Sequence, residues 1–130
     1  MKLSVENKQE ITVLKFETVE KNLNSLKSYG PHTYAILMDE RGNYIQVAGG
    51  LFTCFVERFD SKEKKIYRAT HAISSTNFED GSVLVFGGGS VKLNKNNWFN
   101  IEDVIKLFNS FFLNEKYPED IDWELLNNIF

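Results

Sequence analysis

The residues of this sequence best suited to catalysis are one cysteine, Cys54, and two histidines, His32 and His71. A cysteine nucleophile needs a base close by, usually a histidine that a carboxylate orients. Cys54 and His71 both lie in strand-like segments, so the two could meet across a sheet. No local motif fixes that arrangement, and we interpret Cys54 as a small buried hydrophobe and His71 as a half-buried strand residue. The sequence predicts no catalytic residue and a protein that is not an enzyme.

Metal and phosphate motifs are also missing. No His or Cys pair has the spacing of a zinc site, and the acids near the C-terminus lack the glycine of a calcium loop. Gly87-Gly88-Gly89 follows a strand, but neither a helix pattern nor a Lys-Ser/Thr pair comes directly after it. We interpret these glycines as a turn or bulge at the end of the strand. The prediction is a protein without metal or cofactor.

Aromatic residues dominate the composition, with 11 Phe, 5 Tyr and 2 Trp in 130 residues. Rings exposed on a sheet can stack on RNA bases, but such sheets also carry cations for the phosphates. The candidate cations here are Arg58, Arg68 and the lysines of the segment 62–65. We favour a Phe-rich core and keep an aromatic-sheet module that binds nucleic acid or nucleotides as the alternative function.

Acidic residues gather near the C-terminus of a chain whose net charge is −3. Such a cluster repels phosphate and attracts a basic partner, so direct binding of nucleic acid is disfavoured. We predict that the partner-binding surface contains these acids and Trp98, which is expected to be an aromatic anchor in the polar segment 94–100. Trp123 is expected to be half-buried. The five acids are Glu115, Glu119, Asp120, Asp122 and Glu124.

The single cysteine excludes an internal disulfide and favours a reducing compartment. The first 16 residues lack the apolar core of a signal peptide, and no apolar run is long enough to cross a bilayer. We therefore expect a cytoplasmic protein without membrane contact. The sequence carries no signal for an oligomeric state.

Hydrophobic periodicity predicts one α+β domain over residues 1–130, with an antiparallel meander of about five or six strands packed by two or three helices. Several strands have apolar residues at both odd and even positions, so both of their faces are apolar. This pattern indicates that both faces of the sheet are covered. Strands are expected at 34–38, 44–48, 51–59, 66–72 and 82–86, with 91–93 extending or following the last, and short β-like runs within 3–16.

Three helices are expected. The first covers 19–28, with Thr18 as its cap, and ends before Gly30-Pro31. The second follows Asn100, where apolar residues recur at three- and four-residue spacing. The third is short, from Asp122 to Ile129. The predicted core contains Phe52, Cys54, Val56, Val104, Phe108 and Phe111.

The tail FNSFFLNEKYPEDIDW over residues 108–123 resembles the end of a known family, the first-numbered family of bacterial polymorphic-toxin immunity proteins. In that family a helix with an aromatic face leads to a polar turn, a proline and then a tryptophan. The segments YIQVAGG, FVER and YRA resemble its central strands, so the resemblance covers about residues 34–125. It implies a protein without activity of its own that binds and neutralises a cognate toxin domain, often a nucleic-acid deaminase or nuclease. An acidic inhibitor would complement the cationic surface of such a toxin.

Overall fold

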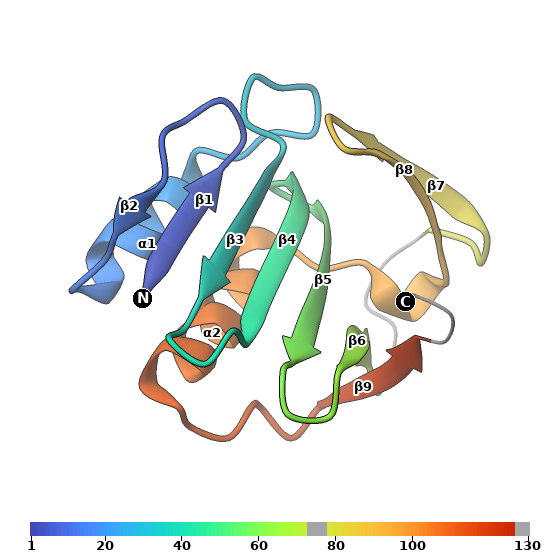
Figure 1. Cartoon of the computed structure of the whole chain (residues 1–130). Coiled ribbons are helices and arrows are strands. Elements are labelled where there is room, and N and C mark those ends of the chain that lie inside the picture. The colour runs from blue at the N-terminus through green and yellow to red at the C-terminus, as the bar shows by residue number, and fades with distance from the viewer. Residues whose placement is uncertain (73–77, 127–130) are drawn as a thin grey trace.

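The computed structural model describes residues 1–72 and 78–126. These residues form seven strands in one antiparallel sheet, a second sheet of two strands, and two α-helices (Figure 1). The predicted α+β class and antiparallel arrangement are confirmed, with more strands than expected. The elements are β1 (Lys2–Val5), β2 (Ile11–Thr12), α1 (Phe16–Asn24), β3 (Tyr34–Met38), β4 (Tyr44–Gly50), β5 (Thr53–Asp60), β6 (Lys65–His71), β7 (Ser82–Phe86), β8 (Gly89–Leu93), the 3-10 turn η1 (Lys95–Asn97), α2 (Ile101–Leu113) and β9 (Ile121–Leu126).

The large sheet has the order β2-β1-β3-β4-β5-β6-β9, and every neighbouring pair is antiparallel. The segments 82–86 and 91–93, expected within or beside the meander, instead form the separate hairpin β7–β8. The place beside β6 is taken by β9, which comes from the end of the described chain. In Figure 1 the hairpin lies on the side of the sheet opposite the helices, where its residues Leu84 and Leu93 pack with Ala48 and Phe55 of the sheet.

Helix α1 differs from the expected helix at both ends. Its N-cap is Lys15, which makes no side-chain cap hydrogen bond, and Thr18 lies within the first turn. The earlier start allows the ring of Phe16 to pack against Phe112 of α2 at a centroid distance of 5.7 Å. The helix ends at Asn24, well before Gly30 and Pro31. Tertiary packing of an aromatic residue therefore decided where this helix begins.

Helix α2 begins where the sequence predicts. The side chain of Asn100 accepts a hydrogen bond from the Asp103 main-chain nitrogen at 2.8 Å, as an N-cap should. The helix ends at Asn114, whose φ of 54° is left-handed. Val104 and Phe108 are buried against the sheet, and Phe111 is partly buried against the same core. No helix among the described residues is long and apolar enough to cross a membrane.

The third predicted helix is wrong. Residues 121–126 form the strand β9, which pairs with β6 from His71↔Ile121 to Ile66↔Leu126. The apolar spacing that suggested a helix also fits a strand. Residues 121–126 form a strand because they pair with the hydrogen-bonding edge of β6. Ile129, the last residue of the expected helix, lies outside the described residues.

The core has two parts, one on each face of the large sheet. The first lies between the sheet and the helices, and it contains the predicted residues Cys54, Val56, Val104 and Phe108. Phe52 was predicted there wrongly: it is 76% exposed, in the turn before β5. The second part lies under the hairpin and consists of Ala48, Phe55, Leu84, Leu93 and Trp98. Both faces of the sheet are therefore covered, as the apolar strands indicated, but a hairpin covers the second one.

Candidate partner-binding surface

The five predicted acids lie along the chain from the end of α2 to the sheet edge formed by β9, and we refer to them as the acidic edge. Glu115, Glu119 and Asp120 are exposed in the segment that joins α2 to β9, and Asp122 and Glu124 are exposed on β9 itself. The ion pairs found in residues 1–72 and 78–126 involve none of these five acids. The structure thus presents five exposed carboxylates that form no ion pair within the described residues.

Strand β9 directs its acids and its tryptophan to opposite faces. Asp122 and Glu124 lie across from Thr70 and Arg68, whereas Trp123 lies across from the buried Ala69. The half-buried position expected for Trp123 is confirmed. The strand therefore anchors itself to the domain through one face and presents its charges on the other.

Trp123 belongs to an aromatic enclosure around Arg58, which sequence reasoning missed. The guanidinium carbon lies 4.4 Å from the ring centroid of Tyr67, 4.8 Å from that of Trp123 and 5.7 Å from that of Tyr117. Such contacts stabilise a cation through the negative ring faces. The Nε atom of Arg58 is buried and has no hydrogen-bond partner in the described structure. The available signal was the proline-to-tryptophan spacing of the tail, which supplies two of the three rings.

A cleft of about 600 Å³ lies beside this enclosure, with Arg58 and Tyr117 in its lining. Its other walls are the β3–β4 turn, the β5–β6 turn and the end of α2, where the exposed Glu115 stands. Burial raises the pKa of the Tyr117 hydroxyl, although the charge of Arg58 acts to lower it. Because Glu115 and Tyr117 belong both to the lining of the cleft and to the α2–β9 segment, the cleft adjoins the start of the acidic segment.

Two aspartates of the cleft have local structural roles. Asp39 Oδ1 accepts hydrogen bonds from the main-chain nitrogens of Arg41 and Asn43 at 2.8 and 3.0 Å. Asp60 Oδ1 accepts from the main-chain nitrogens of Lys62 and Glu63 at 2.9 and 3.1 Å. These contacts are those of aspartates that stabilise turns. The β3–β4 and β5–β6 turns therefore hold the two walls of the cleft in a defined shape.

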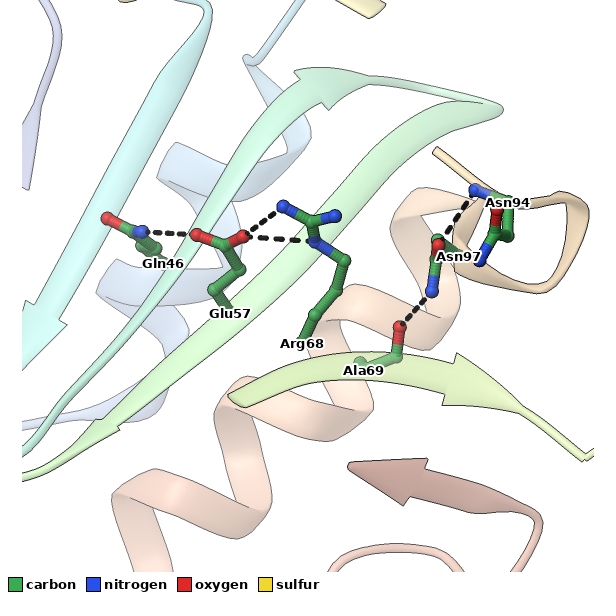
Figure 2. Close-up of polar contacts among 6 residues, drawn as sticks. All are labelled: Gln46, Glu57, Arg68, Ala69, Asn94 and Asn97. Atoms are coloured by element: carbon green, nitrogen blue, oxygen red, sulfur yellow. Dashed lines mark hydrogen bonds and ion pairs between the residues drawn. The ribbon is translucent and has the colours of Figure 1, made fainter. Parts of the chain in front are cut away.

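Trp98 does not lie on this surface, in contrast to its predicted role as an exposed anchor. It is 2% exposed, belongs to the second core and stacks on Phe78 at a centroid distance of 4.3 Å. The polar residues before it form a tight turn instead of a loop: Asn97 accepts from the Asn94 main-chain nitrogen at 2.8 Å and donates to the Ala69 carbonyl at 3.3 Å (Figure 2). This anchoring to β6 turns Trp98 inward.

The cysteine and the histidine that were considered as a catalytic pair, and interpreted as structural residues, are both buried. Cys54 is fully buried, and burial raises the pKa of its thiol to about 12. The ring of His71 stacks on Phe99 at a centroid distance of 3.9 Å, and its Nε2 has no hydrogen-bond partner in the described structure. His71 is buried, not half-buried as expected. Within the described residues, no group of three or more His, Cys, Asp and Glu side chains could hold a metal ion.

The buried position of Cys54 leads to a first prediction. We expect the native thiol to be unreactive toward Ellman's reagent at pH 8 and to react fully once the chain is unfolded in urea. The raised pKa also has a consequence for stability. Above the ordinary thiol pKa, near 9, the unfolded chain loses a proton that the folded chain keeps, so this group lowers stability as the pH rises from about 9 to 12. Rapid labelling of the native protein at pH 8 would contradict the buried position.

The face of the sheet opposite the helices carries a polar row across three strands (Figure 2). Glu57 Oε1 accepts a hydrogen bond from Gln46 Nε2 at 3.0 Å, and its Oε2 accepts from Arg68 Nε and Nη2 at 3.0 and 2.7 Å. Arg68 was a candidate cation for nucleic acid, but a carboxylate of the same domain already binds it. The charge that a phosphate would require is thus offset within the sheet.

The glycine run is confirmed as a turn, the one that joins β7 to β8. The main-chain nitrogen of Gly87 donates to Thr33 Oγ1 at 2.8 Å, and Thr33 donates in turn to Glu6 Oε1 through its nitrogen at 2.8 Å and its hydroxyl at 2.6 Å. A Cβ atom on Gly87 would overlap the Glu6 carboxylate. The glycine therefore allows the tip of the hairpin to approach the body of the domain.

No protein-family model and no curated protein matches this chain. The resemblance to the immunity family accordingly rests on the sequence segments quoted above. The class that the described structure defines is an α+β domain with an acidic sheet edge and an adjoining cleft.

Proposed function

We propose that this protein is an immunity protein of the bacterial cytoplasm that binds and neutralises a cognate toxin domain. The observation that carries the proposal is the acidic edge, whose five exposed acids run from the end of α2 to β9 and have no ion-pair partner in the described structure. A toxin that acts on nucleic acid, as a deaminase or nuclease does, must present cations to phosphates. The acidic edge is complementary to such a surface.

The exposed positions of the acids indicate that they attract the partner electrostatically during association and are not buried in the interface. All five are exposed, so each keeps its hydration until the partner arrives. Exposed rim charges mainly raise the association rate, whereas buried and hydrogen-bonded charge pairs mainly slow dissociation. The adjoining cleft, with Arg58 held in its lining by three rings, would receive a protruding side chain of the toxin. The acidic edge would thus bring the partner in, and the cleft would fix its position.

The test of the function uses the protein encoded by the neighbouring upstream reading frame, whose C-terminal domain we expect to be the toxin. Expression of that domain in a bacterial host should arrest growth, and co-expression of this protein should restore it. The purified proteins should form a complex of equal stoichiometry by calorimetry. The proposal would be contradicted if the protein neither bound nor neutralised the toxin. Tight binding of the isolated protein to oligonucleotides would favour the alternative function, an aromatic-sheet module that binds nucleic acid.

The acids lead to a second prediction, measured by surface plasmon resonance at two salt concentrations. Glu119→Lys combined with Asp120→Lys should slow association by about tenfold or more at low ionic strength. The dissociation rate should change little, and the salt dependence of association should flatten. A matched control is Glu17→Lys with Glu20→Lys, which reverses two exposed charges on α1. Equal effects of the two double variants would mean that net charge alone, and not the acidic edge, steers binding.

A further inference from the structure

Among residues 1–72 and 78–126, strand β7 pairs only with β8, and its other edge lacks the usual protection against pairing. Natural sheet edges are short, charged or interrupted by proline, because an exposed edge pairs with other chains. The two edges of the large sheet follow this rule: β2 has two residues, and β9 carries Asp122 and Glu124. Strand β7 reads Ser-Val-Leu-Val-Phe, with no charge and no proline. Its outer valines are widely exposed, Val83 at 48% and Val85 at 66%.

The register of the hairpin shows which main-chain groups lie on that edge. Phe86 and Gly89 flank a two-residue turn and form its closing pair, so they are hydrogen-bonded to each other. Hydrogen-bonded and free pairs alternate along an antiparallel ladder, which makes Leu84 the next bonded residue of β7. Val83 and Val85 therefore direct their N–H and C=O groups away from β8. No hydrogen bond joins these groups to another part of the described chain.

We propose that this edge pairs with the β7 edge of a second copy of the same chain. A twofold axis beside Leu84 places Val83 opposite Val85 of the second copy, and the reverse. The two pairs exchange four main-chain hydrogen bonds and merge the hairpins into one four-stranded antiparallel sheet. The exposed valines then lie side by side on the outer face, where β-branched cross-strand pairs stabilise a sheet.

A second copy suits this edge better than an unrelated strand. β7 has no charged side chain to select a partner sequence, so its specificity comes from register and shape alone. In the twofold arrangement the two β7 strands are identical, so each strand offers the other the same register and shape, as an isologous interface requires. The net charge of −3 on each chain gives only mild repulsion. The acidic edge on β9 takes no part, so this inference is independent of the proposed function.

The expected association is weak, because four hydrogen bonds and four valines bury less than the ~1,200 Å² of a standard interface. Sedimentation velocity of the full chain should show monomer at low concentration and a growing fraction of dimer as the concentration rises. Val85→Lys should shift this equilibrium at least tenfold toward monomer, because a lysine on an edge strand opposes pairing. The matched control is Ser90→Lys, which places the same charge on β8 directly across from Val85. Ser90→Lys should dimerise like the unmodified chain.

A second variant tests the hydrogen bonds alone. Val85→Pro removes an N–H that points away from β8, so the hairpin should persist while the dimer is lost. The NMR shift of the Gly87 amide, which is bound to Thr33, reports whether the hairpin still docks. A hairpin that stays docked with unchanged dimerisation would refute pairing through β7.

Disulfide trapping tests the register. Oxidised glutathione should link an equal mixture of Val83→Cys and Val85→Cys chains, whose Cα atoms would lie about 5.5 Å apart across the axis. Either variant alone should link poorly, because identical positions would be roughly 8–9 Å apart, beyond the reach of a disulfide. The buried Cys54 provides the internal control that stays unmodified. A chain that is monomeric at all concentrations, or equal linkage in all three samples, would overturn the inference.

Discussion

Replacement of Phe108 by alanine is expected to lower the free energy of unfolding by about 3–5 kcal/mol. Phe108 is completely buried in α2, within the core between the helices and the large sheet. The substitution removes the transfer free energy of the ring and leaves a cavity that rigid neighbours fill only in part. Urea unfolding followed by circular dichroism measures the loss, and an unchanged slope with denaturant would show that the two states are otherwise the same.

The control for this substitution is the same change at Phe52. That ring is 76% exposed, so Phe52→Ala should cost less than about 0.5 kcal/mol. The sequence alone assigned both rings to the core, and the structure separates them. Similar losses for the two variants would contradict the exposed turn before β5, and a loss below about 1 kcal/mol for Phe108→Ala would contradict the packing of α2 on the sheet.

Replacement of Trp98 by alanine is expected to have an effect of similar size, about 3–5 kcal/mol. This side chain fills the second core, between the sheet and the β7–β8 hairpin, and stacks on Phe78. Its loss should loosen the hairpin first, so hydrogen exchange should accelerate more at the β8 amides than at the α2 amides. Binding to the proposed toxin partner should fall only as far as the fraction of folded protein falls.

Trp98→Phe separates packing from hydrogen bonding. The indole Nε1 is buried and has no hydrogen-bond partner in the described structure, so removing the N–H breaks no bond. Phenylalanine keeps most of the buried ring, and we expect less than half the loss seen with alanine. If Trp98→Ala kept full stability but lost affinity for the proposed toxin partner, the result would support the sequence-based prediction that Trp98 is an anchor of the interface.

The sequence by itself determined those strands and helices whose hydrophobic pattern fits only one type of secondary structure. The patterns in residues 34–38 and 44–48 produced β3 and the first five residues of β4, and the short turn between them set their antiparallel pairing. The extension of β4 through Gly49 and Gly50 was not predicted. The apolar spacing after Asn100 and its cap produced α2 within a residue of its expected start. The five acids lie close together along the chain, and the structure leaves all five exposed; their membership of one partner-binding surface stays a prediction.

The tertiary structure decided what depends on partners distant in the chain. Residues 121–126 became a strand because β6 offered them a hydrogen-bonding edge, which no local pattern reveals. Trp98 became buried because Asn97 is bound to the Ala69 carbonyl, 28 positions earlier, which fixes the direction of the chain. The enclosure of Arg58 joins rings from β6, β9 and the segment between α2 and β9. Periodicity describes one segment at a time, whereas these features arise from the free energy of contacts between segments.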